Sequence, residues 1–304
     1  SKKGNVVFTD VTNDVASTLQ NFGLVCDAVW TDANNDGLID LIVVGEWMPV
    51  TVFKNIGGKL SAVDSDLNKQ TGWNNSIASA DVDNDGDMDY VVGNFGENSF
   101  YRASEQHPVN AYAIFTTDEL KSSLKLSANT FSTFWIENKG KMQFVIHKLP
   151  ALAQFSNVNG IVLNDYNSDG NLDIALNSND FTMATMLGRN DAMNGIILQG
   201  NGKGDFQPLS IVKSGLFIPY NGKALISTLI KDQPVLMATQ NAGKLKAFRF
   251  KKVEGKIIRL NNDDQYTIVS LKNGEKRKEE YFYGSSYLSQ SDRFVILNSS
   301  IKSV

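Results

Sequence analysis

Aspartate is concentrated in three short stretches of the sequence that share one pattern. "DANNDGLID" begins at Asp32, "DVDNDGDMD" at Asp81 and "DYNSDGNLD" at Asp165. Each has the form D-x-[DN]-x-D-G-x-x-D, with oxygen-bearing side chains at the first, third, fifth and ninth positions. Carboxylates at this density repel one another, and a hard cation that takes six to eight oxygen ligands would remove the repulsion. The pattern therefore predicts three Ca²⁺ loops.

The position of each residue in its loop decides whether it is expected to be a ligand. Side chains at positions one, three, five and nine and the carbonyl at position seven are expected to contact Ca²⁺. A glycine at position six suits a sharp turn with positive φ. Asp87 stands at position seven, so its carboxylate is expected to point outward. The predicted set is Asp32, Asn34, Asp36, Leu38 and Asp40; Asp81, Asp83, Asp85, Asp87 and Asp89; and Asp165, Asn167, Asp169, Asn171 and Asp173.

Two other interpretations of such a loop are weaker. An EF-hand needs a bidentate glutamate at position twelve, where these loops have Val43, Val92 and Leu176. The runs that follow the loops, such as "DLIVVG", are rich in strand-forming residues rather than helical in their pattern. A plain polar turn would explain one loop, but not three copies at one spacing. We therefore predict strand–loop–strand sites.

These residues resemble a known family. The loops and "VVGNFG" over 91–96 are similar to FG-GAP/VCBS repeats, the blades of integrin-α-like β-propellers. "GRNDAMNG" and the closing "YGSSYLSQSDRFVIL" are similar to propeller proteins with an ASPIC/UnbV-type C-terminus, which are common in Bacteroidetes. The resemblance implies an all-β propeller of four-stranded antiparallel blades with Ca²⁺ loops over residues 1–250, about five blade equivalents. It also implies a small β module over 251–304.

The spacing of the loops predicts how the blades follow one another. Asp32 and Asp81 are 49 residues apart, about one four-stranded blade. Asp81 and Asp165 are 84 residues apart, which is long for one blade and short for two. We expect either a deleted blade or residues missing near 113–116, and we favour the second because losing a blade exposes two sheet edges. The start, "NVVFTDVT", is expected to be an outer strand whose blade begins before residue 1.

Local turn signals predict further elements. "STFWIENKGKMQFVIHKLP" predicts a hairpin around 138–140, and a second hairpin is expected over 200–204. Three strands are expected later in the chain, with turns at 232–234 and 241–243. "TTDELKSSL" predicts a short helix with Thr116 or Thr117 as its N-cap.

Motifs typical of catalysis do not occur in the sequence. It contains no G-x-S-x-G, H-E-x-x-H, phosphate loop or C-x-x-C. His107 and His147 lack the cysteine or acidic neighbours that zinc or nucleophilic chemistry requires. Cys26, in an apolar run, is expected to be a core residue rather than a reactive thiol. We therefore expect a protein that is not an enzyme.

Glu46, Trp47 and Trp73 offer a different kind of site. A carboxylate beside aromatic rings can hold a sugar, although packing and a surface charge explain the same residues more simply. Three functional hypotheses follow: a protein-interaction platform, a glycan-binding propeller of a surface polysaccharide-uptake system, and a polysaccharide-degrading enzyme. The first is favoured and the third is the weakest.

Charge and calcium affinity predict the location and the partners. The net charge of −4 gives no basic surface for nucleic acid, and no apolar run approaches the ~18 residues of a transmembrane helix. Ca²⁺ sites in extracellular modules bind at ~10⁻⁴–10⁻³ M, which is too weak for the cytosol. We therefore expect a periplasmic or cell-surface protein. The resemblance implies partners among other envelope proteins, in an outer-membrane complex, and a lipidated N-terminus that precedes this sequence.

Overall fold

Four antiparallel sheets follow one another between residues 24 and 249. The computed structural model describes residues 8–98, 116–121, 123–182, 188–250 and 255–304. The first sheet contains β1 (Leu24–Thr31), β2 (Asp40–Pro49), β3 (Thr51–Ile56) and β4 (Lys59–Ala62), and β5 (Thr71–Trp73) also pairs with β2. The second contains β6 (Ser76–Ala80), β7 (Asp89–Gly93), β8 (Phe134–Asn138) and β9 (Phe144–Lys148).

The third and fourth sheets repeat this order. The third contains β10 (Val158–Asn164), β11 (Asp173–Ser178), β12 (Ile196–Gly200) and β13 (Phe206–Leu209). The fourth contains β14 (Asn221–Ile230), β15 (Gln233–Asn241) and β16 (Lys246–Arg249). The first strands of successive sheets are neighbours in space, since β6 contacts β1 and β10, and β10 contacts β14. The chain is therefore all-β, built from consecutive antiparallel sheets.

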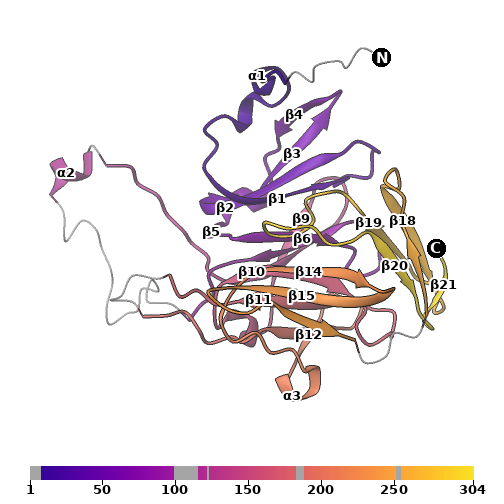
Figure 1. Cartoon of the computed structure of the whole chain (residues 1–304). Coiled ribbons are helices and arrows are strands. Elements are labelled where there is room, and N and C mark those ends of the chain that lie inside the picture. Colours follow the sequence, from indigo (N-terminus) through magenta and orange to yellow (C-terminus); the bar gives the residue numbers. More distant parts are fainter. Residues whose placement is uncertain (1–7, 99–115, 122, 183–187, 251–254) are drawn as a thin grey trace, which may run out of the picture.

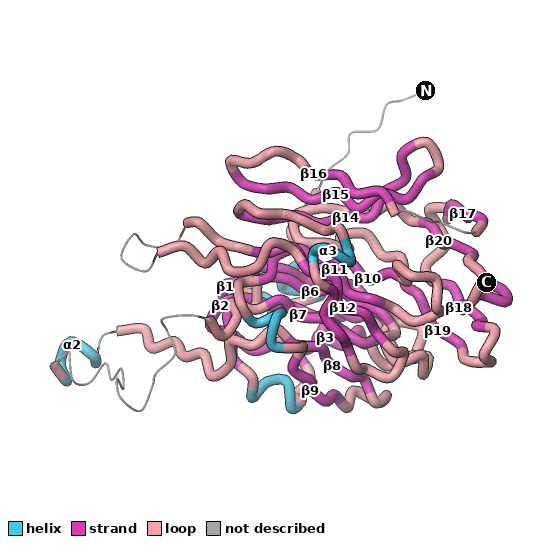
Figure 2. Tube along the Cα trace, turned by 90° about the horizontal axis from the view of Figure 1, so that it is seen from below, coloured by secondary structure: helices cyan, strands magenta, loops and turns pink. Residues whose placement is uncertain are grey.

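The last fifty residues, 255–304, form a separate group of strands that we call the C-terminal module. In one small sheet, β17 (Lys256–Arg259) pairs with β20 (Phe294–Leu297). In the other, β18 (Tyr266–Leu271) lies between β19 (Lys276–Glu280) and β21 (Ile301–Ser303). Figure 1 and Figure 2 both place this module at one side of the four sheets, opposite the helix α2 (Thr117–Lys121).

In the second and third sheets, the second strand is buried on both faces and connects neighbouring cores. In β7, Tyr90 and Val92 pack into the cluster shared with the first sheet, whereas Val91 packs into the cluster shared with the third. The alternation repeats in β11, where Ala175 faces the fourth sheet. Because successive side chains of a strand point to opposite faces, these continuous apolar runs hold three adjacent sheets together.

Two glycines allow the inner ends of neighbouring sheets to approach closely. A Cβ on Gly93 of β7 would lie 2.6 Å from the carbonyl oxygen of Val158 in β10. A Cβ on Gly160 of β10 would lie 2.5 Å from the Cβ of Leu225 in β14. Any larger residue would push the sheets apart at these two points.

Most of the predicted elements are confirmed. The three Asp-rich loops each connect the first two strands of a sheet, and both predicted hairpins form, as β8–β9 and β12–β13. The helix α2 begins after Thr116, whose side chain and main chain exchange hydrogen bonds with Glu119. The first of the two later turns lies earlier than predicted: it consists of Lys231 and Asp232, which both have positive φ, and Gln233 and Pro234 already belong to β15.

One prediction differs from the structure and another stays a prediction. The described residues before 250 form four sheets. The expected number of about five blade equivalents stays a prediction, because residues 99–115, which include most of the proposed gap near 113–116, lie outside the described residues. The predicted strand at the start is wrong for its described part, because 8–11 form no strand and α1 (Thr12–Val15) follows. Asp10 accepts the main-chain N–H of Thr12 at 2.9 Å, a local bond that competes with strand pairing.

The remaining helical elements in the described part of the chain are single turns. They are α3 (Ile211–Ser214) and the 3₁₀ helices at Ser17–Leu19, Asp66–Lys69 and Ala151–Gln154. Over the described ranges, no helix has the length and apolar character needed to cross a membrane.

Candidate metal centre

The first aspartate of each loop turns inward and accepts hydrogen bonds from the loop's own main chain. Asp81 accepts the N–H groups of Asp85 at 3.1 Å and Gly86 at 3.0 Å. Asp32 and Asp165 accept the equivalent pairs in their loops at 2.9–3.1 Å. The glycine at position six has positive φ in all three loops, 94° for Gly86, so the sharp turn predicted there is confirmed.

The ninth aspartate of each loop joins the loop to the third strand of its sheet. Asp89 is fully buried and accepts the N–H groups of Val82, in the loop, and Asn138, at the end of β8, both at 2.8 Å. Asp40 and Asp173 make the same two kinds of bond. The sequence pattern predicted these residues as ligands and did not reveal this second, bracing role.

In the second loop, three carboxylates gather at one point. Ligand oxygens of Asp81, Asp83 and Asp89 all lie within 4.8 Å of one another. Burial, then the neighbouring carboxylates, raise the pKa of Asp81 to about 7, of Asp83 to about 6 and of Asp89 to about 9. Since burial penalises the charged form and like charges add to the penalty, this cluster has a strong preference for a proton or a cation.

The cluster also contains an unmatched ligand atom. Among the described residues, the buried Oδ1 of Asp83 has no hydrogen-bond partner. A buried carboxylate oxygen without a donor is costly, and an oxygen-seeking divalent cation would satisfy it. The residues of the second loop therefore fit a divalent cation.

The other predicted ligands of the second loop lie outside this cluster. Asp85 is exposed, and its carboxylate accepts the N–H of Asp87 at 2.9 Å. The Asp87 carboxylate points to the first loop, where it accepts a hydrogen bond from Asn35. Asp87 can therefore contribute to a cation in its own loop through its main-chain carbonyl, as predicted, and not through its carboxylate.

The first and third loops are arranged differently at position three. The Asn34 amide donates to the Asp36 carboxylate at 3.0 Å, and Asn167 donates to Asp169 at 2.9 Å. Lys54 also lies 3.3 Å from Asp36. Within the described chain, these two loops do not gather three carboxylates as closely as the second loop does. Leu38 and Asn171, at position seven, are predicted to contribute carbonyls only, and the Leu38 side chain is exposed.

A second repeated motif supports the loops and was missed in the sequence. The hairpin between the third and fourth strands carries an asparagine whose Oδ1 accepts an N–H within the turn: Asn55, Asn138 and Asn201. The Asn138 side chain also donates to the carbonyl of Ala33, in the first loop, at 2.8 Å. The signal was present as an asparagine with a glycine one to three residues after it, in "FKNIGGK", "IENKGK" and "QGNGKG".

An aromatic row lies at the opposite end of β2 from the first loop. The rings of Trp47 and Trp73 are 5.1 Å apart, and Trp73 stacks on Phe95 at 4.8 Å. Trp47 has a φ of 59° at a bulge between Glu46 and Met48. Positive φ is unfavourable for a bulky side chain, so the surrounding pairing holds this ring in place.

The remaining candidate residues have ordinary environments. Cys26 is half-buried rather than fully buried as expected, and burial, followed by the charge of Glu46, raises the pKa of its thiol. A raised pKa lowers the thiolate fraction that reactivity needs. His147 stacks on Trp135 and pairs with Glu137 at 2.8 Å. His107 lies outside the described residues.

Comparison with known protein families finds a match that covers the first two loops. Residues 32–92 match the family of FG-GAP-like repeats. The match begins at Asp32, the first residue of the first loop, and ends in β7 beyond the second loop, so this FG-GAP-like repeat covers one full loop-to-loop period. No curated protein matches the chain. The ASPIC/UnbV resemblance of 251–304 stays a prediction.

Proposed function

We propose that the chain is a calcium-stabilised β-propeller that works as a non-enzymatic protein-interaction platform in an extracytoplasmic complex. One observation carries the proposal: the same Asp-rich loop recurs between the first two strands of three successive sheets. The FG-GAP-like repeat over 32–92 supports a binding rather than a catalytic role. The side-by-side first strands β1, β6, β10 and β14 support a propeller.

Calcium would be held by the loop residues already described. Asp81, Asp83 and Asp89 present converging oxygens in the second loop, and the first and third loops repeat its pattern. The ion would supply positive charge between strand ends whose carboxylates otherwise repel one another. Three such sites in one chain favour a compartment with millimolar calcium, and we propose the bacterial cell envelope, with other envelope proteins as partners.

A calcium titration tests the metal part of this proposal. Calorimetry on metal-free protein is expected to show about three equivalents bound, with dissociation constants of roughly 10⁻⁴–10⁻³ M. Elemental analysis of the purified protein provides an independent count. No heat of binding and no metal would show that the loops are only turns. Binding at nanomolar calcium would remove the argument for an extracytoplasmic location.

The interaction part is tested separately. Chemical cross-linking in the native envelope, with and without chelator, should yield a defined complex whose amount falls when calcium is removed. The matched variant is Asp83→Asn, which disables the second loop without changing its size. A single uncomplexed species in both conditions would contradict the platform role.

The aromatic row supports a second candidate function, glycan binding. Trp47 is held at a strained φ beside Glu46, and Trp73 lies against it. Strain that neighbouring structure maintains is common at ligand sites, and sugars stack on such rings. A glycan array should lose signal with Trp47→Ala and keep it with Trp30→Ala. Trp30 is an exposed ring near the end of β1 that lies at the first loop, away from the aromatic row. Equal signals would exclude this row as the site, and glycan cleavage would favour an enzyme.

A further inference from the structure

Strand β19 of the C-terminal module lies across the Asp-rich loops. Its sequence, "KRKEE", is the most charged run of the chain's end, yet Arg277 and Lys278 are only 3% and 6% exposed. Glu279 lies 2.7 Å from Arg277, and Glu280 lies 2.9 Å from Lys278. The pair of Lys278 and Glu280 is therefore buried against the sheets, and Arg277 is buried beside the partly exposed Glu279. Buried charges persist only where their partners are fixed.

Each of the three loops meets the C-terminal module at its first aspartate. In the second loop, the main-chain N–H of Lys278 donates to the Asp81 carboxylate at 2.9 Å. In the third loop, the side chain of Asn298 donates to the Asp165 carboxylate at 2.8 Å. In the first loop, the Glu280 carboxylate accepts the main-chain N–H of Asp32 at 3.2 Å. Three loops from three sheets thus share one partner.

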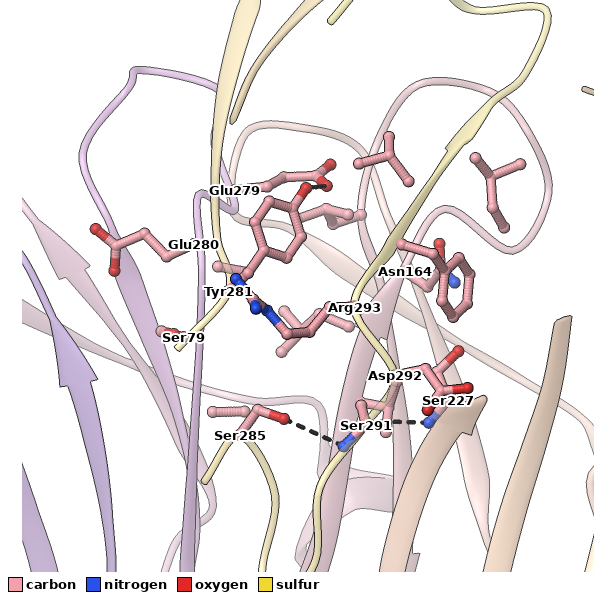
Figure 3. A pocket seen from close by; sticks show the side chains of 18 of the residues that line it. Ser79, Asn164, Ser227, Glu279, Glu280, Tyr281, Ser285, Ser291, Asp292 and Arg293 are labelled. Atoms are coloured by element: carbon pink, nitrogen blue, oxygen red, sulfur yellow. Dashed lines mark hydrogen bonds between the residues drawn. The ribbon is translucent and has the colours of Figure 1, made fainter. Parts of the chain in front are cut away.

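Secondary contacts hold these three groups in position. The Arg277 guanidinium donates to the carbonyl of Gly170, at position six of the third loop, at 2.6 Å. Glu280 also accepts a hydrogen bond from Thr31, which in turn bonds the buried Tyr90 hydroxyl. The Tyr281 hydroxyl donates to the Glu279 carboxylate at 2.7 Å, and Figure 3 shows the two side chains next to each other. Both line a cavity of about 180 Å³ between the module and β6, β10 and β14.

We infer that the C-terminal module is the outer layer of the metal loops. Lys278, Asn298 and Glu280 are positioning residues: each holds the first aspartate of one loop, through its carboxylate or its main chain, in the orientation that a cation needs. Groups that orient metal ligands typically change metal affinity by 10- to 100-fold when they are lost. Metal binding and docking of the module are then coupled, so each strengthens the other by the same factor. This inference rests on the calcium role proposed above.

Asn298 provides the sharpest test, because Asp165 of the third loop is the one first-position aspartate that its side chain contacts among the described residues. In the double variant Asp36→Asn/Asp83→Asn, the third loop alone keeps all its acidic ligands, because Asp83 belongs to the carboxylate cluster of the second loop. In that background, Asn298→Ala should weaken calcium binding about tenfold in calorimetry. Asn273→Ala is the matched control, since Asn273 lies exposed in the β18–β19 turn and bonds only within it, and it should leave the affinity unchanged.

A second background separates positioning from general destabilisation. In Asp36→Asn/Asp169→Asn, the second loop alone keeps its acidic ligands, and its partner in the module is the main chain of Lys278. Here Asn298→Ala should leave calcium affinity unchanged. Equal weakening in both backgrounds would mean that Asn298 only stabilises the fold, and would overturn the inference.

Hydrogen exchange of the unmodified chain tests the coupling without substitutions. Calcium should slow exchange of the Lys278 amide by about tenfold, while the amide of Leu236, in β15 away from the loops, reports on global stability. If calcium binds but neither the Asn298 variants nor the Lys278 amide respond, the outer-layer role is wrong and the calcium loops stand. If the unmodified chain binds no calcium, the proposed metal role fails, and this inference with it.

Discussion

Asp83 distinguishes the second loop from the other two at a single side chain. Asn34 and Asn167, at the same position, donate from their amides to the fifth-position carboxylate of their loops. A carboxylate has no hydrogen to donate at neutral pH, so Asp83 adds charge where the other loops add a hydrogen bond. The second loop is therefore the least stable of the three without a cation and the most responsive to one.

The substitution Asp83→Asn should accordingly have opposite effects in two conditions. Without calcium it removes repulsion and restores the amide bond, and we expect the free energy of unfolding to rise by about 1 kcal/mol. With calcium it removes a ligand, and the variant should fall below the unmodified chain. Denaturant titrations with calcium and with chelator measure both effects. Asp87→Asn is the control, since its carboxylate points to Asn35; a shift of the same sign in both conditions would count against a metal at this loop.

Asp27, in β1, carries a partly buried charge unrelated to the loops. Burial raises its pKa to about 6, although it accepts the N–H groups of Ala28 and Ile77 at 2.9 and 3.1 Å. A carboxyl group whose pKa is higher in the folded than in the unfolded chain stabilises the fold most below pH about 4. That stability is lost as the pH rises through about 6.

The effect of Asp27→Asn on the free energy of unfolding should therefore have opposite signs at high and low pH. At pH 8 it removes a charge-burial cost of at most about 3 kcal/mol, because burial raises the pKa of Asp27 from 3.8 to about 6. It also loses one of the two accepted hydrogen bonds, about 1 kcal/mol. The variant should be more stable at pH 8 and less stable at pH 4 in parallel chemical denaturation. A difference that does not vary with pH would show that folding does not raise the pKa of Asp27.

At the scale of elements, the sequence allowed accurate prediction wherever the signal was local. The D-x-[DN]-x-D-G loops and the hairpins at 138–140 and 200–204 depend on turn residues within ten positions of one another. The position of β19 could not be predicted this way. Arg277 and Lys278 have the composition of a solvated charged strand, and their burial depends on Gly170 and Asp81, more than one hundred residues away.

Gly160 lies at the contact between the third and fourth sheets, where Gly222 is packed as tightly. Gly160 has an ordinary φ, so a methyl group there has no backbone cost, but it would lie 2.5 Å from the Leu225 Cβ. We expect Gly160→Ala to destabilise the chain by about 2–3 kcal/mol through overpacking. Gly274→Ala is the comparison: its φ is 97° with nothing within 4 Å, so only the backbone cost of about 1 kcal/mol applies. Thermal unfolding of both variants compares the two costs, and equal losses would mean that the sheets adjust freely.

At the scale of the whole molecule, calcium bound at the three loops should raise the free energy of unfolding of the chain. A ligand that binds only the folded chain stabilises it by about 1.4 kcal/mol per site at tenfold saturation, or about 4 kcal/mol for three sites. This is a large part of a typical stability of 5–15 kcal/mol. Chelation should lower the melting temperature by several degrees, with Mg²⁺ in place of Ca²⁺ as the control. A melting curve that chelator does not move would contradict metal stabilisation.

The hydrogen bond between Thr31 and Glu280 joins residues 249 positions apart. Contacts of such long sequence separation form slowly, because the chain must close a large loop first. During synthesis at about 5–20 residues per second, roughly 10–50 s pass between the appearance of Thr31 and that of Glu280. The sheets can assemble in order during that interval, whereas the first loop cannot form its contact with Glu280 until that residue has been synthesised. A nascent chain interrupted before Glu280 would therefore expose a complete row of acidic loops to chaperones and proteases.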